Sequence, residues 1–464
     1  MATITFWGAV GTVTGSRHQL ELDGKKYLID CGMFQGLKEN RLRNWEPFPT
    51  APYDFDKVFL THAHIDHTGY LPRFVNEGFQ GQVHCTYATR DLCEVMLHDS
   101  AHLQEEDAKW ANKRGYSKHK PALPLYTVDD AEKAMKLFQP VHYGYEMYLN
   151  NSVRIKFKDA GHILGSSFID IKRIDGRSSK KILFSGDFGR PDRPVLREPV
   201  QVYNVDYLIL ESTYGDRLHE DNDPYEELEK VINESYRRRG VLIIPSFSVG
   251  RTQTILYAIR EMEKDNKIPV MPVYLDSPMA IRATEIFEGR INDLNLTARK
   301  KRLAGENIFR PEELHICKTV DESKAINRVS EKAIIISASG MVTGGRILHH
   351  LAYRLPESQN TVLFIGYQAK GTRGRTILEG KPEVKIHGQK VPVRARVESI
   401  SGFSGHGDYQ EIIAWLKAFN KKPKKTFIVH GEPEASQAMA EHIRQELNWE
   451  TVIPKFGDHF ELDF

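Results

Sequence analysis

The hydrophobic pattern of the chain changes character along its length. Residues 1–30 alternate short apolar segments with glycine turns, which is typical of strands and hairpins. Residues 89–114 and 127–138 repeat apolar positions at helical spacing. Residues 140–210 return to short strands. The first part of the chain is therefore predicted to be a strand-rich unit with a few helices.

From about residue 209 the pattern becomes a regular alternation of strands and helices. Its strands are short apolar runs without alternating polar positions. Such strands, separated by amphipathic helices, predict a parallel sheet that is covered by helices on both faces. The predicted strands are 241–245, 272–276, 333–337 and 361–365, and the predicted helices are 251–264, a helix from 278, and 340–355.

After about residue 395 the chain returns to short strands. Strand-rich segments therefore enclose the alternating segment, which predicts that one domain is inserted into another. We expect the outer domain to comprise residues 1–208 and 396–464, and the inserted domain to comprise residues 209–395. A chain of 464 residues is long enough to build two such cores.

Composition and charge narrow the class of protein. The net charge is +2 at pH 7, so an anionic partner must be met by a local basic patch. The four cysteines show no C-x-x-C spacing, which argues against a disulfide scaffold and against a cysteine zinc knuckle. No signal peptide and no apolar stretch of membrane length is visible, so we expect a cytoplasmic protein without a membrane partner.

The strongest chemical signal is the segment His62-Ala63-His64-Ile65-Asp66-His67, which directly follows an apolar run. A buried strand thus delivers three imidazoles and a carboxylate into one short loop. Packed together, protonated imidazoles repel each other, and neutral imidazoles leave polar nitrogens that must be paired. One or two bound divalent metals resolve this conflict, because imidazole and carboxylate are ordinary zinc ligands. The alternative interpretation is a polar surface loop.

Other ligand-type residues stand at the ends of further predicted strands. His162, Asp187 and His430 each follow an apolar run and have a glycine neighbour. For any one of them alone, a turn residue at a strand end is an equally good interpretation. Together with the motif at 62–67 they favour a shared metal site, because a metal needs about four ligands. Asp30 closes another strand, and we interpret it as a carboxylate that orients a ligating histidine.

A basic segment lies near the end of the predicted insert. Residues 366–396 contain eight lysines and arginines and two glutamates, which gives a net charge of +6. The glycines around Arg373 would let the backbone come close to a phosphate. We interpret Lys370, Arg373 and Arg375 as contacts to a nucleic-acid backbone, and a solvated basic face is the alternative.

These motifs resemble the metallo-β-lactamase fold, and the inserted segment resembles its β-CASP branch, which processes nucleic acids. Three further motifs carry the second resemblance: Glu211 in Leu-Glu-Ser-Thr-Tyr-Gly, His406 in Ser-Gly-His-Gly-Asp-Tyr, and His430 in Val-His-Gly-Glu. The resemblance covers essentially the whole chain. It is nearest to the bacterial and archaeal relatives of the endonuclease subunit that cuts pre-messenger RNA before polyadenylation.

The resemblance implies a fold and a set of metal ligands. The implied fold is of the α/β class, an αββα sandwich with an inserted β-CASP domain built on a parallel sheet. Two zinc ions are expected per chain. By resemblance, one ion is held by His62, His64 and His162, the other is held by Asp66, His67 and His430, and Asp187 bridges them. Such a pair of metals supplies a hydroxide at neutral pH that attacks a phosphodiester.

Three residues are expected to be catalytic. By resemblance, His406 is the general acid that gives a proton to the departing alkoxide. Glu211 keeps His406 protonated, because a nearby carboxylate raises the pKa of an imidazole. Asp66 is counted as catalytic as well as a ligand. Without the resemblance, a histidine in a glycine-rich turn and a glutamate at a strand end are the simpler interpretations of the first two.

The predicted function is zinc-dependent hydrolysis of single-stranded RNA, with cleavage inside the strand. Arg251, Ser339 and Gly340 lie in segments that also resemble the family, and we expect them to contact RNA. By resemblance, a histidine at position 430 goes with RNA-processing members of the family. The alternatives are a 5′-exoribonuclease or a DNA-repair nuclease of the same family, a small-molecule thioester or lactone hydrolase, and a non-catalytic RNA-binding scaffold. The sequence leaves the oligomeric state open, and a homodimer is one option.

Overall fold

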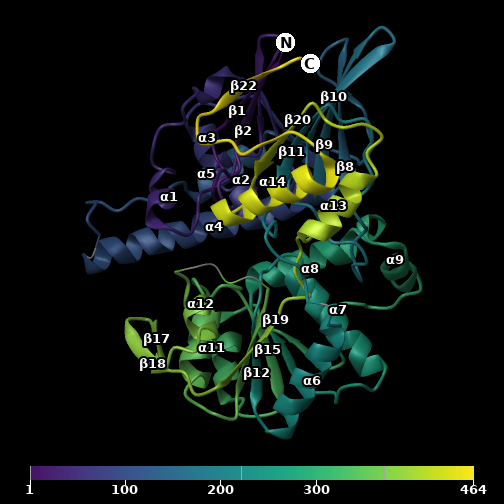
Figure 1. Ribbon diagram of the computed structural model, residues 1–464. Helices are drawn as coiled ribbons and strands as arrows, with labels where there is room; N and C mark the ends of the chain where they lie inside the picture. The colour runs from purple at the N-terminus through teal and green to yellow at the C-terminus, as the bar shows by residue number, and fades with distance from the viewer. Residues whose placement is uncertain (1, 116, 221, 367, 369–370) are drawn as a thin grey trace. The chain divides into compact units, whose positions relative to one another are not determined.

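The computed structural model describes residues 2–115, 117–220, 222–366, 368 and 371–464 (Figure 1). The chain forms two compact units. Unit 1 comprises Met1–Asp192, Arg197–Leu218 and His406–Phe464, and unit 2 comprises Arg193–Leu196 and His219–Gly405. Among the described residues, no helix has both the length and the apolar character that a membrane span requires.

The first sheet of unit 1 has seven strands in the order β22-β1-β2-β3-β4-β5-β6. Strands β22, β1, β2 and β3 pair antiparallel, whereas β3, β4, β5 and β6 pair parallel. The first and last strands of the chain are therefore neighbours in this sheet (Figure 1). The bounds are β1 Ala2–Phe6, β2 His18–Leu22, β3 Lys25–Ile29, β4 Phe55–Phe59, β5 Gln82–Thr86, β6 Phe138–Val141 and β22 His459–Leu462.

The second sheet of unit 1 also has seven strands, in the order β21-β20-β11-β10-β9-β8-β7. Alternate residues of β8 are buried, and Val153, Ile155 and Phe157 join the apolar core that lies between the two sheets. This alternation is the pattern of a strand with one face on a core. The bounds are β7 Met147–Tyr148, β8 Val153–Asp159, β9 Ser167–Asp175, β10 Ser178–Phe184, β11 Tyr207–Glu211, β20 Lys425–Val429 and β21 Thr451–Val452.

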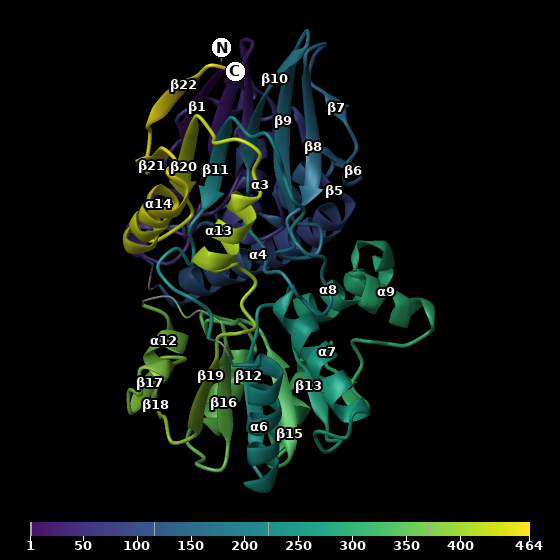
Figure 2. The same ribbon diagram turned by 45° about the vertical axis from the view of Figure 1, so that its right-hand side comes forward.

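Helices cover the outer faces of both sheets of unit 1 (Figure 2). Helix α4 packs on β5 and β6 of the first sheet, and α14 packs on β20 and β21 of the second. The result is the predicted αββα sandwich, and the α/β class is confirmed. The helices of this unit are α1 Lys38–Leu42, η1 Pro52–Asp54, α2 Ile65–Thr68, α3 Leu71–Asn76, α4 Tyr87–Arg114, α5 Val128–Met135, α13 Tyr409–Lys417 and α14 Pro433–Leu447.

Unit 2 is built on a six-stranded sheet in the order β14-β13-β15-β12-β16-β19, and all its pairs are parallel. Every residue of β12, β15 and β16 is buried, as expected for a parallel sheet with helices on both faces. The strands are β12 Val241–Pro245, β13 Val273–Leu275, β14 Leu314–Ile316, β15 Ala333–Ser337, β16 Thr361–Ile365 and β19 Arg396–Ile400, with a hairpin of β17 Glu383–Ile386 and β18 Gln389–Pro392.

The helices of unit 2 alternate with these strands along the chain, which confirms the predicted alternation. A separate hairpin stands beside them, and helix α12 packs on its first strand. The bounds are α6 Pro224–Arg237, α7 Arg251–Lys264, α8 Pro278–Gly289, η2 Ile291–Asp293, α9 Leu296–Leu303, α10 Val320–Ala325, η3 Ile326–Arg328, α11 Ile347–Arg354 and α12 Arg373–Leu378.

One predicted helix and both predicted domain limits differ from the structure. The helix expected at 340–355 begins only at Ile347, because Val342 and Gly345 adopt left-handed backbone with φ of +57° and +80°. The change between units comes at 218/219 and 405/406, whereas the sequence placed it at 208/209 and 395/396. The reason is pairing: β11 belongs to the second sheet of unit 1, and β19 pairs with β16 in unit 2.

Candidate active site

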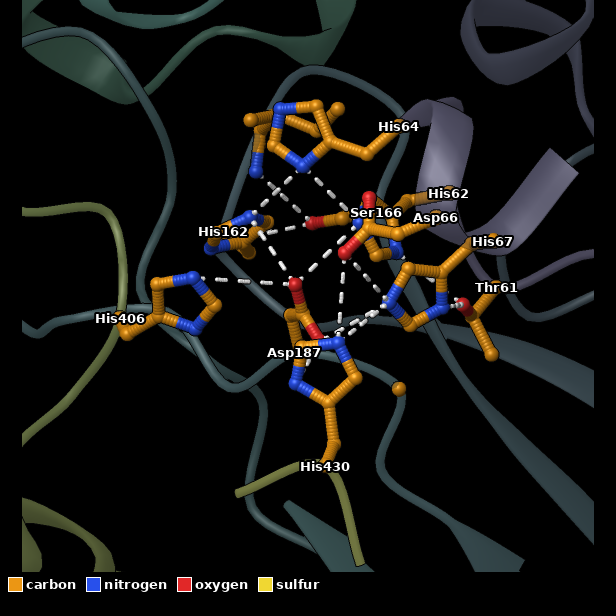
Figure 3. A network of polar contacts seen from close by, with 12 residues as sticks. Thr61, His62, His64, Asp66, His67, His162, Ser166, Asp187, His406 and His430 are labelled. Carbon is orange, nitrogen blue, oxygen red and sulfur yellow. Dashed lines mark hydrogen bonds and ion pairs between the residues drawn. The ribbon is translucent and has the colours of Figure 1, made fainter. Parts of the chain in front are cut away.

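The predicted metal ligands converge where strands of unit 1 end (Figure 3). Most of these side chains are buried, and His64 and Asp66 are half-buried. The loops after several neighbouring strands therefore supply one shared group of polar atoms. His62 and His64 follow β4, Asp66 and His67 lie on α2, His162 lies between β8 and β9, Asp187 follows β10, and His430 follows β20.

A first ligand group combines one side-chain atom each from His62, His64, His162 and Asp187. His64 Nδ1 lies 3.1 Å from His62 Nε2 and 3.3 Å from His162 Nε2. Asp187 Oδ2 lies 3.4 Å from the same two Nε2 atoms. Four ligands placed ~2.0–2.1 Å from a zinc ion lie ~3.3–3.4 Å apart at the corners of a tetrahedron. The measured edges have this size, so the group fits a zinc ion.

A second ligand group consists of Asp66, His67 and His430. His67 Nε2 lies 3.2 Å from His430 Nε2, and Asp66 Oδ2 lies 3.9 Å and 3.4 Å from these two nitrogens. Asp187 also faces this group, because its Oδ1 lies 3.2 Å from His67 Nε2. One carboxylate oxygen of Asp187 therefore faces each group, which is the geometry of a bridging ligand.

Burial keeps imidazoles of the first group neutral and encloses the carboxylate of Asp187, and both effects favour a bound cation. Loss of hydration lowers the pKa of His62 to about 3 and the pKa of His64 to about 4, so both rings are neutral and carry a lone pair. Asp187 Oδ1, the oxygen that faces the second group, is also buried; it lies 3.2 Å from His67 Nε2 and accepts no hydrogen bond from the described part of the chain. An anionic oxygen buried in this way is costly unless a cation compensates it. The donor set thus fits a divalent metal.

Asp30 and Thr61 form hydrogen bonds with the ring nitrogens of His67 and His62 that face away from the ligand groups. Asp30 Oδ2 accepts a hydrogen bond of 2.7 Å from His67 Nδ1. The same carboxylate accepts hydrogen bonds from the backbone N (2.7 Å) and the Oγ1 (2.8 Å) of Thr61. Thr61 Oγ1 in turn accepts from His62 Nδ1 at 3.1 Å. These bonds fix the orientation of both rings, as the role predicted for Asp30 requires.

Thr61 and two further hydroxyl residues of the site are absent from the sequence-based prediction. Thr213 Oγ1 lies 3.1 Å from His430 Nδ1. Ser166 Oγ accepts hydrogen bonds from the backbone N of His162 at 2.9 Å and of Ile163 at 3.2 Å, which shapes the loop that carries His162. Serine and threonine are too common to be singled out by residue type. Their position beside a ligand motif is the signal that could have found them.

His406 lies beside the ligand groups and is held by Glu211. Its Nδ1 lies 3.0 Å and 3.2 Å from the two carboxylate oxygens of Glu211, which is fully buried. Its Nε2 faces Asp187 Oδ2 at 3.8 Å (Figure 3). Burial disfavours the charged ring, but the carboxylates of Glu211 and Asp187 outweigh this effect and raise the pKa of His406 to about 9. A protonated nitrogen is thereby directed at the ligand groups.

Three residues expected to contact RNA lie in unit 2, after the carboxyl ends of parallel strands. Arg251 is the first residue of α7, and its guanidinium lies against Gly366, where an added Cβ would be 3.4 Å from Arg251 Nη2. Ser339 and Gly340 follow β15, and Ser339 Oγ lies 2.9 Å from Thr343 Oγ1. Loops at this edge of a parallel sheet are a common place for ligands.

The arginines of the basic segment contact the protein itself. Arg373 Nε donates to the backbone O of Lys385 at 2.8 Å, and its Nη1 donates to two further carbonyl oxygens. Arg375 Nε pairs with Glu379 at 2.7 Å. Lys370 lies outside the described residues. The contact of these residues with RNA stays a prediction.

Two ligand groups that share one carboxylate, at the edge of an αββα sandwich, define a metal-dependent hydrolase. Family comparisons give the particular family. Residues 19–196 match the metallo-β-lactamase superfamily domain, residues 252–377 match the β-CASP domain, and residues 390–454 match the Zn-dependent metallo-hydrolase RNA specificity domain. The chain belongs to the β-CASP family of metallo-β-lactamase-fold hydrolases. This family implies a divalent metal, typically zinc, and the two ligand groups offer the donors for it.

Several curated proteins are similar over nearly the whole chain. Ribonuclease TTHA0252 of Thermus thermophilus is 35% identical, over 97% of this chain and 98% of the relative. The RNase J-like protein of Methanocaldococcus jannaschii is 32% identical, over 98% of this chain and 99% of the relative. Transcription termination factor FttA of the same organism is 30% identical, over 97% of this chain and 70% of the relative.

A solved structure is similar in fold. The crystal structure of a protein of unknown function from Enterococcus faecalis V583 superimposes with a TM-score of 0.53, covering 99% of this chain and 100% of that chain. The sequence identity is 12%, so this similarity concerns the fold alone.

Proposed function

We propose that this protein is a zinc-dependent ribonuclease that hydrolyses phosphodiester bonds within single-stranded RNA. The observation that carries the proposal is the place of Asp187, which turns one oxygen to each ligand group while His406 Nε2 lies 3.8 Å away. RNA as the substrate is supported by the match of residues 390–454 to an RNA specificity domain and by a relative that is named a ribonuclease.

We assign two zinc ions to the two ligand groups. Zinc bound by such ligands supplies a hydroxide nucleophile at neutral pH and neutralises charge on phosphate oxygens. The donors match the preference of zinc for imidazole and carboxylate. The assigned ligands are His62, His64, His162 and Asp187 for one ion, and Asp66, His67, His430 and Asp187 for the other.

The protein's own residues handle the leaving group. We assign His406 Nε2 as the atom that gives a proton to the departing oxygen of the phosphodiester. Glu211 keeps the ring oriented, because its carboxylate holds Nδ1 and is itself fixed by the backbone N of Phe188 and of Thr213. The His406 side chain is 20% exposed, so water can return the proton after each cycle.

We also propose that RNA is received by loops of unit 2, namely by Arg251, Ser339 and Gly340 and by the basic segment with Lys370, Arg373 and Arg375. The net charge of the segment supports this proposal, since phosphate contacts dominate nucleic-acid affinity. Replacing Arg373 and Arg375 together by alanine should flatten the slope of log affinity against log salt by ~0.7 per lost contact. An unchanged slope would make the segment a solvated basic face.

The test of the proposed function compares matched single strands of RNA and DNA, labelled at the 5′ end, at one salt concentration. We expect the zinc-loaded protein to cut RNA internally, to leave DNA intact, and to lose this activity in Asp187→Asn. Labelled mononucleotide as the first product would instead support a 5′-exoribonuclease. DNA cleavage at an equal or higher rate would support the repair nuclease, and hydrolysis of thioesters or lactones without nucleic-acid cleavage would overturn the assignment.

A further inference from the structure

The far half of helix α4 and the loop after it form a basic surface that the proposed mechanism does not use. Residues 109–120 contain no aspartate or glutamate. Residues three or four apart share a helix face, so Trp110 lies on the same side of α4 as Lys113 and Arg114. We call this set the distal basic surface, and its members are Lys109, Trp110, Lys113, Arg114, Lys118 and Lys120.

Trp110 is an exposed aromatic residue with cations beside its ring. Its exposed fraction is 45%, and Arg114 Cζ and Lys113 Nζ lie 4.9 Å and 5.4 Å from the ring centroid. Among the described ion pairs, Lys109 is the one basic residue of this surface that meets a carboxylate, Glu106 at 2.9 Å. An indole in water next to cations offers a face for a stacked base and charges for the adjoining phosphates.

The loop after α4 is folded back onto the helix. Asn112 Nδ2 donates to the backbone O of Ala122 at 2.9 Å, and the backbone N of Ala122 donates to Asn112 Oδ1 at 2.7 Å. Further along, the backbone N of Leu125 donates to Gln104 Oε1 at 3.0 Å. These bonds tether the segment 117–121, which is exposed from Lys118 onward, to α4. The stretch of backbone that carries Lys118 and Lys120 is therefore held close to the helix.

Helix α4 joins the distal basic surface to the ligand groups. At the start of the helix, Thr86 Oγ1 and Thr89 Oγ1 donate to the backbone O of Gly165 at 2.7 Å and 2.8 Å, in the loop that carries His162. Trp110 lies 24 residues after Thr86, which corresponds to roughly 36 Å of helix at ~1.5 Å per residue. The surface is thus fixed to the site but distant from it.

The distribution of charge along α4 separates the distal basic surface from the site as a place of contact for an anionic strand. Residues 105–107 are all acidic and are separated from Lys109 by one alanine. The acidic stretch repels an anionic strand, whereas the basic residues that follow attract it. Such a strand would therefore contact the site and the distal basic surface but not the part of α4 between them. Only a strand long enough to span the distance can contact both places.

We propose that the distal basic surface is an exosite for single-stranded RNA. The proposal rests on the ribonuclease function proposed above and names a second place where the same substrate is held. Charge complementarity selects the occupant, because an apolar protein partner would have to desolvate the lysines and arginine without pairing them. A nucleic-acid strand supplies phosphates for these cations and a base for the indole at the same time.

The experiment measures steady-state cleavage by the zinc-loaded enzyme on single-stranded RNA of ~30 and ~6 nucleotides. The first length exceeds the ~4–16 nucleotides that a single-strand binding domain contacts, and the second lies near the lower end of that range. Trp110→Ala should raise KM for the long RNA by about tenfold, as expected for the loss of one stacked base. Its kcat on the long RNA and both constants on the short RNA should equal those of the wild type. Lys113→Ala/Arg114→Ala should flatten the salt dependence of kcat/KM for the long RNA by ~1.4, at ~0.7 per contact.

Matched controls come from the same unit. Trp45 has a similar exposed fraction of 48%, and Trp45→Ala should leave KM for the long RNA unchanged. Lys133→Ala/Lys136→Ala removes equal charge from helix α5 and the residue that follows it, and should leave the salt dependence unchanged. A loss shared by Trp45→Ala or by the α5 variant would overturn the specific role of the distal surface.

Four further results would overturn the exosite. An unchanged KM of Trp110→Ala on long RNA, in an enzyme that cleaves RNA, would remove the exosite and leave the ribonuclease in place. Equal losses on long and short RNA would show a general effect on the enzyme. A changed sedimentation coefficient with unchanged RNA kinetics would assign Trp110 to a protein contact. If the wild type cleaves no RNA, the proposed function fails, and the exosite fails with it.

Discussion

The side chains behind the histidines decide which ring nitrogen faces the candidate metal site. His67 has its Nδ1 on Asp30 and His430 has its Nδ1 beside Thr213, so both turn Nε2 to the second ligand group. His64 has the opposite orientation, with Nδ1 facing the first group. A flipped ring would present a carbon where a nitrogen is needed. Metal affinity is therefore expected to depend on the residues behind the rings as well as on the ligands themselves.

The first prediction at this scale concerns Asp30. Asp30→Asn keeps the size of the side chain but weakens its hydrogen bond to His67 Nδ1, and it places an amide near the backbone N of Thr61. We expect metal affinity to fall by about 10- to 100-fold. Competition with a chromogenic chelator measures this affinity. The control is Asp56→Asn, which removes a carboxylate that pairs with Lys25 at the surface. Equal affinity in the two variants would remove Asp30 from the site.

The second prediction concerns His406. His406→Ala removes the proposed proton donor but none of the seven proposed ligands. We expect the cleavage rate to fall by ~10²–10⁴-fold, the usual range for an acid–base group. The metal content, measured by elemental analysis, should remain that of the wild type and of the surface control His459→Ala. Loss of metal along with activity would make His406 a ligand, and full activity would exclude it from the mechanism.

At the scale of elements, the start of α4 is braced against the loop that carries His162. Gly165 has φ of +84°, and an added Cβ would lie 2.5 Å from the backbone N of Thr89. Thr89 Oγ1 and Ala88 Cβ would lie 2.8 Å and 2.9 Å from the same Cβ, so little space is left for relaxation. The position of His162 therefore depends on a contact between a helix and a loop that lie far apart in the sequence.

This contact gives the third prediction. Gly165→Ala should lower the free energy of unfolding by roughly 1–3 kcal/mol for the overlap, in addition to ~1–2 kcal/mol for the left-handed backbone. Gly24→Ala is the matched control, because Gly24 has φ of +76° but nothing within 4 Å of an added Cβ. Denaturant midpoints measure both variants. Gly165→Ala should also bind metal more weakly than Gly24→Ala. Equal denaturant midpoints for the two variants would show that the loop relaxes around the added methyl group without loss of stability.

The elements themselves were largely predictable from the sequence. Strands β12, β15 and β16 and helix α7 have the predicted bounds, because each is a long apolar or amphipathic run with clear ends. The segment 340–346 was predicted to be helical and is a loop, although its Gly344-Gly345 pair marks a break in helix propensity. The pairing of β1 with β22 was not predictable, since no local pattern states which distant strands become neighbours.

The candidate site was predictable where residue type carries the signal. Histidines and aspartates at strand ends are distinctive, and the structure brings all seven predicted ligands into two groups that share Asp187. The hydroxyl groups of Thr61, Ser166 and Thr213 were missed, because their role comes from three-dimensional neighbours alone. The contacts of Arg373 with backbone carbonyls were missed for the same reason.

Along the complete chain, the insert separates predicted ligands that lie together in unit 1. His67 and His430 are 363 residues apart, yet their Nε2 atoms lie 3.2 Å from each other. Strand β20 makes this possible, because it returns to unit 1 and pairs in parallel with β11. Unit 1 therefore needs its C-terminal segment both for its second sheet and for its second ligand group. Metal binding should stabilise unit 1 and leave the core of unit 2 untouched.

The tryptophans allow this last prediction to be tested on the intact protein. All five, Trp7, Trp45, Trp110, Trp415 and Trp449, belong to unit 1, so their emission follows the unfolding of that unit alone. A ligand at ~1,000 times its Kd stabilises the folded state by about 4 kcal/mol, which corresponds to a shift in Tm of roughly 10 °C for a unit of this size. Removing the metal with a chelator should therefore lower the Tm seen by tryptophan emission by about this amount.

The unfolding of unit 2 serves as the internal control. Its parallel sheet contributes to far-ultraviolet circular dichroism but carries no tryptophan. In the presence of chelator, the thermal unfolding curve seen by circular dichroism should therefore show two steps. One step should shift to the lower Tm seen by tryptophan emission, and the other should keep its Tm. Adding zinc back should restore the original curve. If the chelator leaves the Tm of the tryptophan transition unchanged but shifts the Tm of the other step, the metal lies outside unit 1. That result would contradict the assignment of both ligand groups.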